Sequence, residues 1–239
     1  QEQMWLKRYA KKTIESYTYW IKGYIIFINK QHPINCHDSD VERYLSYLTN
    51  QLNLAPRTQA IALNALVFLY QHIIEKTLSL NLDFNRSKQN INLPTVLTKR
   101  EVQRLFEHLN PAYLLLCKLM YGSGLRLMEA VRLRIQDIDF DYLSVQVWQG
   151  KGNKNRRVTL AKELTHSLKQ QIEYANLFFE ADLKNSTYKG VYLPFALAKK
   201  YPTAPFNLGW HYLFPSRRLS IDPENNKTRR HHICETNLT

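Results

Sequence analysis

Two basic residues stand in glycine-containing segments where a phosphate group could bind. Arg126 follows Gly122 and Gly124 at the end of an apolar helical pattern and opens the next amphipathic segment. The unpaired N–H groups at the start of a helix carry partial positive charge, so an arginine there is a strong receptor for phosphate or carboxylate. Lys151 lies between two further glycines in a turn, from which it could protonate a leaving oxygen. Together these residues suggest phosphoryl transfer, although a solvated arginine and a turn lysine that aids solubility would have the same spacing.

Glycine is used sparingly, since the chain has 7 in total. We expect one of Gly122 and Gly124 to supply the left-handed residue that ends a helix, and the other to allow a close backbone contact.

The charge balance favours a polyanionic partner. Lys plus Arg number 33 and Asp plus Glu number 20, which gives a formal net charge of +13 over 239 residues. Nucleic acid is the commonest partner for such an excess, and a membrane surface is the alternative. No apolar run approaches the length of a bilayer span. The three scattered cysteines predict a reducing compartment, with neither a disulfide framework nor a zinc site.

The first part of the chain, residues 1–76, is predicted to be a small helical domain. Apolar residues recur at spacings of three and four from residue 13 onward, and polar and basic residues fill the other positions. The unit could be a generic helical bundle, or a clamp on a phosphate backbone that uses Lys11, Lys12 and Arg57. Residues 77–96, rich in Asn and Ser, are predicted to be an interdomain linker.

The second part, residues 97–239, mixes helical and strand patterns. Thr98 and Glu101 form a capping box before a helix. The apolar period then changes to two around residues 135–160, which predicts a three-stranded antiparallel sheet with a hairpin turn at 150–155. A long helix is expected over 161–181. Residues 184–215 combine proline with aromatic residues and predict an ordered insertion. The predicted fold class is mainly α with a small antiparallel β-sheet, α+β.

At this point the motifs are similar to those of a known family. YGSGLRLMEAVRLRIQDID, the turn GKGNKNR and the helical first part resemble the tyrosine recombinases of the phage integrase family. The segments LPFALAKKYPTAPFNLGWHYLFPS and SIDPENNKTRRHHICET resemble the insertion that distinguishes the integron integrases. The resemblance implies a C-shaped clamp on DNA, made of a helical SAM-like core-binding domain and an α/β catalytic domain. It also implies a homotetramer that exchanges strands through a 3′-phosphotyrosine in the bacterial cytoplasm, without metal or cofactor.

Residue roles follow from this resemblance. Arg126 corresponds to the first catalytic arginine and Lys151 to the hairpin lysine, while Glu129, with Gly122 and Gly124, has a structural role near the site. Integron integrases bind double-stranded integration sites and folded single-stranded cassette sites with extruded bases, which can stack on aromatic rings. For Trp210 the alternative is core packing. The expected DNA-binding residues are Lys11, Lys12, Arg57, Trp148, Lys154, Trp210, Pro223, Arg229, Arg230, His231 and His232, of which Trp210, His231 and His232 come first as base readers.

One departure from the family pattern limits the expected activity. The second arginine, in a His-x-x-Arg motif, and the nucleophilic tyrosine of the family have no match in the chain. We therefore expect a C-terminally truncated recombinase that does not cleave DNA alone. The alternative is a non-catalytic DNA-binding remnant that occupies recombination sites or interferes with a full-length integrase. A third reading is an unrelated basic helical scaffold.

Overall fold

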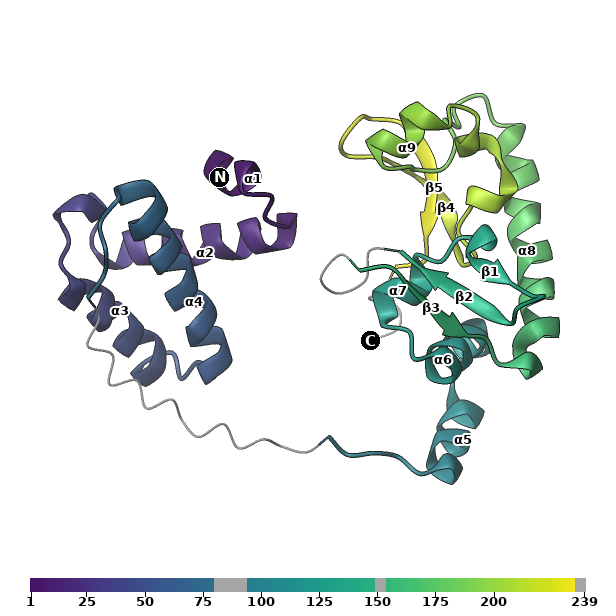
Figure 1. Ribbon diagram of the computed structural model, residues 1–239, viewed down its shortest axis with the longest axis horizontal. Coiled ribbons are helices and arrows are strands. Elements are labelled where there is room, and N and C mark those ends of the chain that lie inside the picture. Colours follow the sequence, from purple (N-terminus) through teal and green to yellow (C-terminus); the bar gives the residue numbers. More distant parts are fainter. Residues whose placement is uncertain (80–93, 149–153, 235–239) are drawn as a thin grey trace. The chain divides into compact units, whose positions relative to one another are not determined.

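The computed structural model describes residues 1–79, 94–148 and 154–234. The chain divides into two compact units, Gln1–Pro94 and Thr95–Thr239 (Figure 1). Helices predominate and the strands form small antiparallel sheets, which confirms the predicted fold class. Residues 80–93 of the predicted linker lie outside the described residues.

The first unit is helical, as its apolar spacing predicted. The helix α4 begins with Pro56, whose fixed φ and missing N–H suit the first helical position. Its core holds fully buried Leu45 and Leu66, and the hydroxyls of Tyr24 and Tyr70 share a buried hydrogen bond at 2.8 Å. The elements are α1 (Glu2–Leu6), α2 (Lys11–Phe27), the 3₁₀ turn η1 (Pro33–Asn35), α3 (Asp38–Asn50), α4 (Pro56–Leu69) and the π-helical η2 (Tyr70–Ile74).

The second unit opens with helices that lead to the candidate site. The N–H of Glu101 donates to the Thr98 hydroxyl at 3.3 Å, and the Glu101 carboxylate accepts from the Thr98 N–H at 2.7 Å. This reciprocal pair confirms the predicted capping box. The elements are α5 (Lys99–His108), α6 (Pro111–Ser123), α7 (Leu127–Val131) and the 3₁₀ turn η3 (Ile135–Asp137).

A three-stranded antiparallel sheet follows, as the period of two predicted. Its order is β1 (Ile138–Asp139), β2 (Ser144–Val147) and β3 (Arg156–Thr159), and Val145 pairs with both Ile138 and Val158. Val145 is fully buried in the core, with Leu116 and Leu119 of α6. After η4 (Lys162–Leu164), the predicted long helix is α8 (Thr165–Leu183), which runs along the unit in Figure 1.

The predicted insertion at 184–215 is ordered in the residues described. It contains α9 (Phe195–Lys200) and the 3₁₀ turns η5 (Ala204–Phe206) and η6 (Leu208–Trp210). It leads into an antiparallel hairpin of β4 (Pro215–Ile221) and β5 (Thr228–His232), whose register shifts between Pro215 and Leu219. Figure 1 shows this hairpin beneath α9 and beside the upper half of α8.

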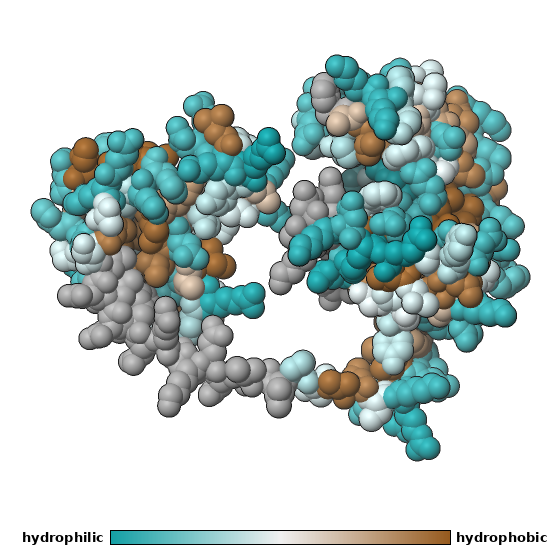
Figure 2. Space-filling model, viewed as in Figure 1, coloured by the Kyte–Doolittle hydropathy of each residue, from teal (hydrophilic) through white to brown (hydrophobic). Residues whose placement is uncertain are grey.

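Hydrophilic side chains cover most of the visible face of each unit, with apolar side chains between them (Figure 2). Within the described part of the chain, none of the helices combines the length and the apolar character needed to cross a bilayer. The same residues contain no group of three or more His, Cys, Asp or Glu side chains arranged to hold a metal ion.

Candidate active site around Arg126

The backbone between α6 and α7 brings Arg126 to the surface. Gly124 ends α6 in the left-handed region with φ of 61°, which favours glycine because it lacks a Cβ. Leu125 turns inward and is buried, and Arg126 then takes an extended conformation before α7. A Cβ on Gly122 would lie 3.6 Å from the Cβ of Ala161, an ordinary contact. The expectation of a close backbone approach at Gly122 is therefore wrong, because a Cβ would fit there.

Glu129 holds Arg126 in two ways. Its carboxylate accepts a hydrogen bond from the Arg126 backbone N–H at 2.9 Å and another from Arg126 Nη1, also at 2.9 Å. The Arg126 side chain stays 56% exposed, so its remaining N–H donors face solvent. Because α7 has only five residues, the positive character of the site comes from arginine side chains rather than from a helix dipole.

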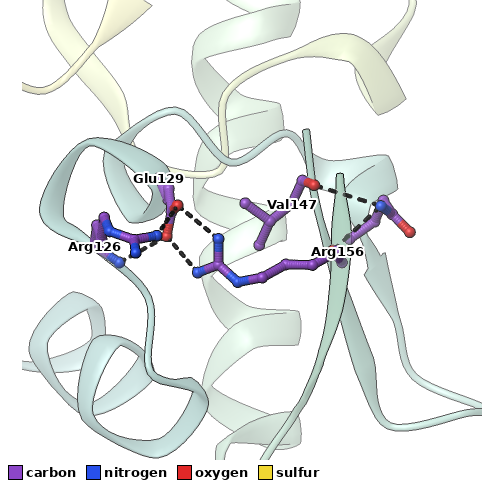
Figure 3. Close-up of polar contacts among 5 residues, drawn as sticks. Arg126, Glu129, Val147 and Arg156 are labelled. Atoms are coloured by element: carbon purple, nitrogen blue, oxygen red, sulfur yellow. Dashed lines mark hydrogen bonds and ion pairs between the residues drawn. The ribbon is translucent and has the colours of Figure 1, made fainter. Parts of the chain in front are cut away.

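Arg156, which the sequence did not single out and which is not the arginine of the His-x-x-Arg motif, also contacts Glu129. Arg156, at the start of β3, donates from Nη1 and Nη2 to the two oxygens of Glu129 at 2.7 and 2.6 Å. Figure 3 shows Arg126, just before α7, and Arg156, on β3, meeting at the carboxylate of Glu129. The pairing of Val147 with Arg156 fixes the strand position from which this side chain reaches Glu129. A carboxylate offers about four acceptor positions, and the two arginines fill all of them.

These contacts keep Glu129 ionised and leave the site positively charged. The hydrogen bonds from Arg156, followed by those from Arg126, lower the pKa of Glu129 to about 2. A carboxylate with this pKa and no remaining acceptor position is a poor general base at neutral pH. Two arginines against one carboxylate leave one net positive charge, which matches the single negative charge of a phosphodiester.

Trp148 directly follows Val147, the last residue of β2 and the partner of Arg156. Trp148 is 59% exposed, and its indole N–H donates to the Asp137 carboxylate at 2.8 Å. Asp137 is buried, also accepts from the Arg134 backbone N–H at 2.9 Å, and has its pKa raised by desolvation. The hydrogen bond therefore fixes the orientation of an exposed aromatic ring.

Trp210 is half-buried between other side chains of the second unit. The Arg134 guanidinium lies 5.8 Å from the Trp210 ring and 5.0 Å from the Tyr212 ring, and it donates to the carbonyls of Tyr192 and Trp210. The Tyr201 ring lies 6.0 Å from the Trp210 ring at an interplanar angle of 37°. These neighbours fix the position of the Trp210 ring, and the residue remains partly exposed.

The basic run in β5 is largely internal, contrary to the expectation for several of its residues. Arg230 is buried and donates from Nε to Asp182 at 2.6 Å, with a second bond to the other carboxylate oxygen. Arg229 lies 3.3 Å from Asp222 and donates to the carbonyls of residues 189, 190 and 191. These arginines join parts of the fold, and a role for them as DNA contacts stays a prediction.

The two adjacent histidines differ in exposure. His231 is exposed while His232 is buried, and both rings pack near Tyr212 at centroid distances of 5.4 and 5.3 Å. Burial makes His232 a poor candidate for stacking on a base, contrary to the expectation. Exposed positions are found for Pro223, Lys154, Lys11, Lys12 and Arg57. Lys151, with its flanking glycines, lies outside the described residues.

Both units match known families. Residues 1–80 match the family described as phage integrase, N-terminal SAM-like domain, and residues 95–236 match the phage integrase family. The chain belongs to the phage integrase family. Proteins called integrase/recombinase from Escherichia coli and Pseudomonas aeruginosa are 34% identical over 235 residues, which cover 98% of this chain and 69% of theirs. A tyrosine recombinase XerC from Leptospira interrogans is 25% identical over 186 residues, covering 72% of this chain and 60% of its own.

Solved structures share the fold. The Tn1549 transposon integrase, in complex with transposon right end DNA, has a TM-score of 0.59 at 14% identity, covering 87% of this chain and 67% of that chain. The XerH site-specific recombinase, bound to a palindromic difH substrate in a post-cleavage complex, has a TM-score of 0.54 at 23% identity, covering 69% of this chain and 53% of that chain. The order of the two units in this chain is that of the family matches, with the SAM-like unit first and the phage integrase unit second.

Proposed function

We propose that the chain binds DNA as a site-specific recombinase of the tyrosine recombinase type, with Arg126 as a ligand of the reacting phosphate. The observation that carries this proposal is the cluster of Arg126, Glu129 and Arg156, which presents an exposed, oriented guanidinium with one positive charge to spare. The formal charge of +13 and the exposed Lys11, Lys12, Arg57 and Lys154 support a polyanionic partner.

The proposed reaction is a phosphoryl transfer in two steps. A tyrosine hydroxyl loses its proton as its oxygen bonds to phosphorus, the bond from phosphorus to the 5′ oxygen breaks, and the 5′ oxygen takes a proton. A 5′ hydroxyl of the exchanged strand then loses its proton as it attacks the 3′-phosphotyrosine, and the released tyrosine oxygen regains a proton. Arg126 would neutralise the non-bridging oxygens as charge develops on them, and Lys151 would supply the proton.

The polypeptide of residues 1–239 is proposed to bind DNA without cleaving it. Its tyrosines include no match to the family's nucleophile, and its histidines include none to the His-x-x-Arg motif. Such a polypeptide would occupy recombination sites or interfere with an active integrase. Assembly into a homotetramer on DNA is part of the proposal.

The proposed substrates are those of integron cassette recombination, a double-stranded integration site and a folded single-stranded cassette site. The sequence resemblance of residues 184–215 to the integron-type insertion supports this, as does the ordering of those residues around Trp210. Among the aromatic residues expected to read extruded bases, Trp148 and His231 are exposed and Trp210 is half-buried. Stacking on an exposed ring is worth about 1–3 kcal/mol per base.

A DNA titration tests the proposed role of Arg126. Fluorescence anisotropy with a labelled duplex would be measured at several salt concentrations for the unaltered chain, Arg126→Ala and Arg100→Ala. Arg100 is exposed on α5 of the same unit and makes the control for loss of one surface charge. We expect Arg126→Ala to weaken binding roughly tenfold and to reduce the salt slope by about 0.9. Equal effects of the two variants would contradict a phosphate contact at Arg126.

A second titration tests the cassette proposal. A DNA hairpin with one unpaired extrahelical base would be compared with the same hairpin in which that base is deleted. We expect the extruded base to strengthen binding to the unaltered chain, and Trp148→Ala to remove most of that gain. Equal affinities for the two hairpins would leave a recombinase of double-stranded sites and rule out the cassette specificity.

A further inference from the structure

Arg156 forms its closest polar contacts away from solvent, at the residue that orients Arg126. Both of its terminal nitrogens bond the Glu129 carboxylate, at 2.7 and 2.6 Å, in the paired geometry that favours arginine over lysine. The Glu129 side chain is only 9% exposed and the Arg156 side chain is 33% exposed. Both terminal nitrogens of Arg156 are therefore engaged by Glu129, whereas the more exposed Arg126 retains donors that face solvent.

The charges of the three residues explain why a second arginine is needed. Glu129 must be ionised to accept from both the backbone and the side chain of Arg126. An ionised carboxylate this close would also cancel the charge of Arg126, and a neutral pair attracts a phosphate weakly. With Arg156 bound to the same carboxylate, the cluster regains one positive charge, and the more exposed side chain, Arg126, can present it.

We propose that Arg156 is a positioning residue for DNA binding: it takes up the charge of Glu129, so that Glu129 orients Arg126 without neutralising it. The inference rests on the proposed function, because it concerns how Arg126 presents its charge to a DNA phosphate. The contacts of Arg156 also link two elements of the site, since Arg156 begins β3 and Arg126 precedes α7. An ion pair that served only the stability of the fold would give the same contacts but a different response to mutation.

Six variants separate the two explanations, measured by anisotropy with a fluorescein-labelled duplex of arbitrary sequence; the sixth, Glu129→Gln/Arg157→Met, is the control for rescue. Arg156→Met and Arg126→Met each remove one arginine, and the double variant Arg126→Met/Arg156→Met tests whether they act together. Glu129→Gln/Arg156→Met removes the carboxylate along with its partner and restores the net charge. Arg157→Met is the matched control, because Arg157 is the next residue of β3, carries the same charge, and is exposed.

The expected results follow from the charge argument. Arg156→Met should weaken DNA binding roughly tenfold, as Arg126→Met does, since each removes one charged hydrogen-bonding group from phosphate binding. The double variant Arg126→Met/Arg156→Met should bind within about twofold of Arg126→Met alone. Glu129→Gln/Arg156→Met should recover most of the lost affinity, whereas Glu129→Gln should not rescue Arg157→Met.

Three results would overturn the inference. These are unchanged affinity in Arg156→Met, additive losses in the arginine double variant, and no recovery in Glu129→Gln/Arg156→Met.

If thermal melts show that Arg156→Met does not fold, the test uses Arg156→Lys and Glu129→Gln/Arg156→Met instead, because both keep the net charge. Each should then bind close to the unaltered chain, and affinity as low as that of Arg126→Met would contradict the inference. A chain that binds no duplex even at low salt would remove the proposed function as well, whereas binding that depends on Arg126 but not on Arg156 would remove this inference alone.

Discussion

Asp182 and Arg230 form a buried ion pair that joins the last turn of α8 to the middle of β5. Arg230 donates from Nε at 2.6 Å and from Nη2 to the second carboxylate oxygen, and it donates from Nη1 to the Ser216 carbonyl at 2.8 Å. The Arg230 side chain is only 8% exposed and the Asp182 side chain only 3%. The Phe178 ring lies 4.7 Å from the guanidinium. This pair anchors the β4–β5 hairpin to the helix that precedes the insertion.

Removing one member of the pair should destabilise the second unit strongly. Arg230→Met leaves the Asp182 carboxylate buried without its partner, which costs about 3–5 kcal/mol of unfolding free energy. The double variant Asp182→Leu/Arg230→Met removes both charges and should recover much of that loss. Urea unfolding monitored by circular dichroism measures both values.

The matched control is the exposed pair of Arg43 and Asp40, whose nearest atoms lie 3.2 Å apart with the Arg43 side chain 70% exposed. Arg43→Met should change the unfolding free energy by at most about 1 kcal/mol. A loss for Arg230→Met no larger than for Arg43→Met would contradict the structural role that we assign to Arg230.

The two glycines before Arg126 should respond differently to alanine. Gly124→Ala places a Cβ at φ of 61° and should cost about 1–2 kcal/mol of unfolding free energy. Gly122→Ala is the control, because Gly122 is helical and a Cβ there would make an ordinary 3.6 Å contact with Ala161. It should be neutral or stabilise the helix by up to about 1 kcal/mol. Urea unfolding of both variants decides the matter, and equal losses would show that the left-handed conformation is not the controlling feature.

The features that sequence reading found share a local origin. The capping box of Thr98 and Glu101, the glycine that ends α6, and the period of two across β2 and β3 all depend on neighbours a few residues apart. Such patterns are set by backbone conformation and by which side of an element is buried. They gave the fold class, the helical first unit and the position of Arg126.

The features that sequence reading missed depend on partners far along the chain. Glu129 and Arg156 are 27 positions apart, and Asp182 and Arg230 are 48 apart. A basic run such as residues 229–232 looks like a DNA-binding patch because the sequence does not show which of its side chains a buried carboxylate will meet. Alternation along β5 decides this, since Arg230 and His232 are buried while His231 between them is exposed.

Arg134 should control the order of the insertion around Trp210. Its guanidinium bonds the carbonyls of Tyr192 and Trp210 and lies over two aromatic rings. Arg134→Met removes these hydrogen bonds and should leave two half-buried carbonyls without their donor, at about 1–3 kcal/mol each. We expect faster cleavage by a limiting amount of protease within residues 184–215, located by mass spectrometry. Arg132→Met, a change at an exposed position two residues earlier, is the control and should leave the cleavage rate unchanged.

Glu129 should make the unfolding free energy sensitive to acid. Its pKa is lowered from 4.5 to about 2 by Arg156 and Arg126. In the pH range between these two values, the folded state therefore binds fewer protons at this group than the unfolded state does. The resulting stabilisation is present above about pH 4.5 and is lost as the pH falls through about 2, with a size of roughly 1–3 kcal/mol after solvent screening. Urea unfolding from pH 6 to pH 2.5 should therefore show the difference between the unaltered chain and Glu129→Gln shrinking as the pH falls. A difference for Glu129→Gln that is constant with pH would contradict the ion cluster.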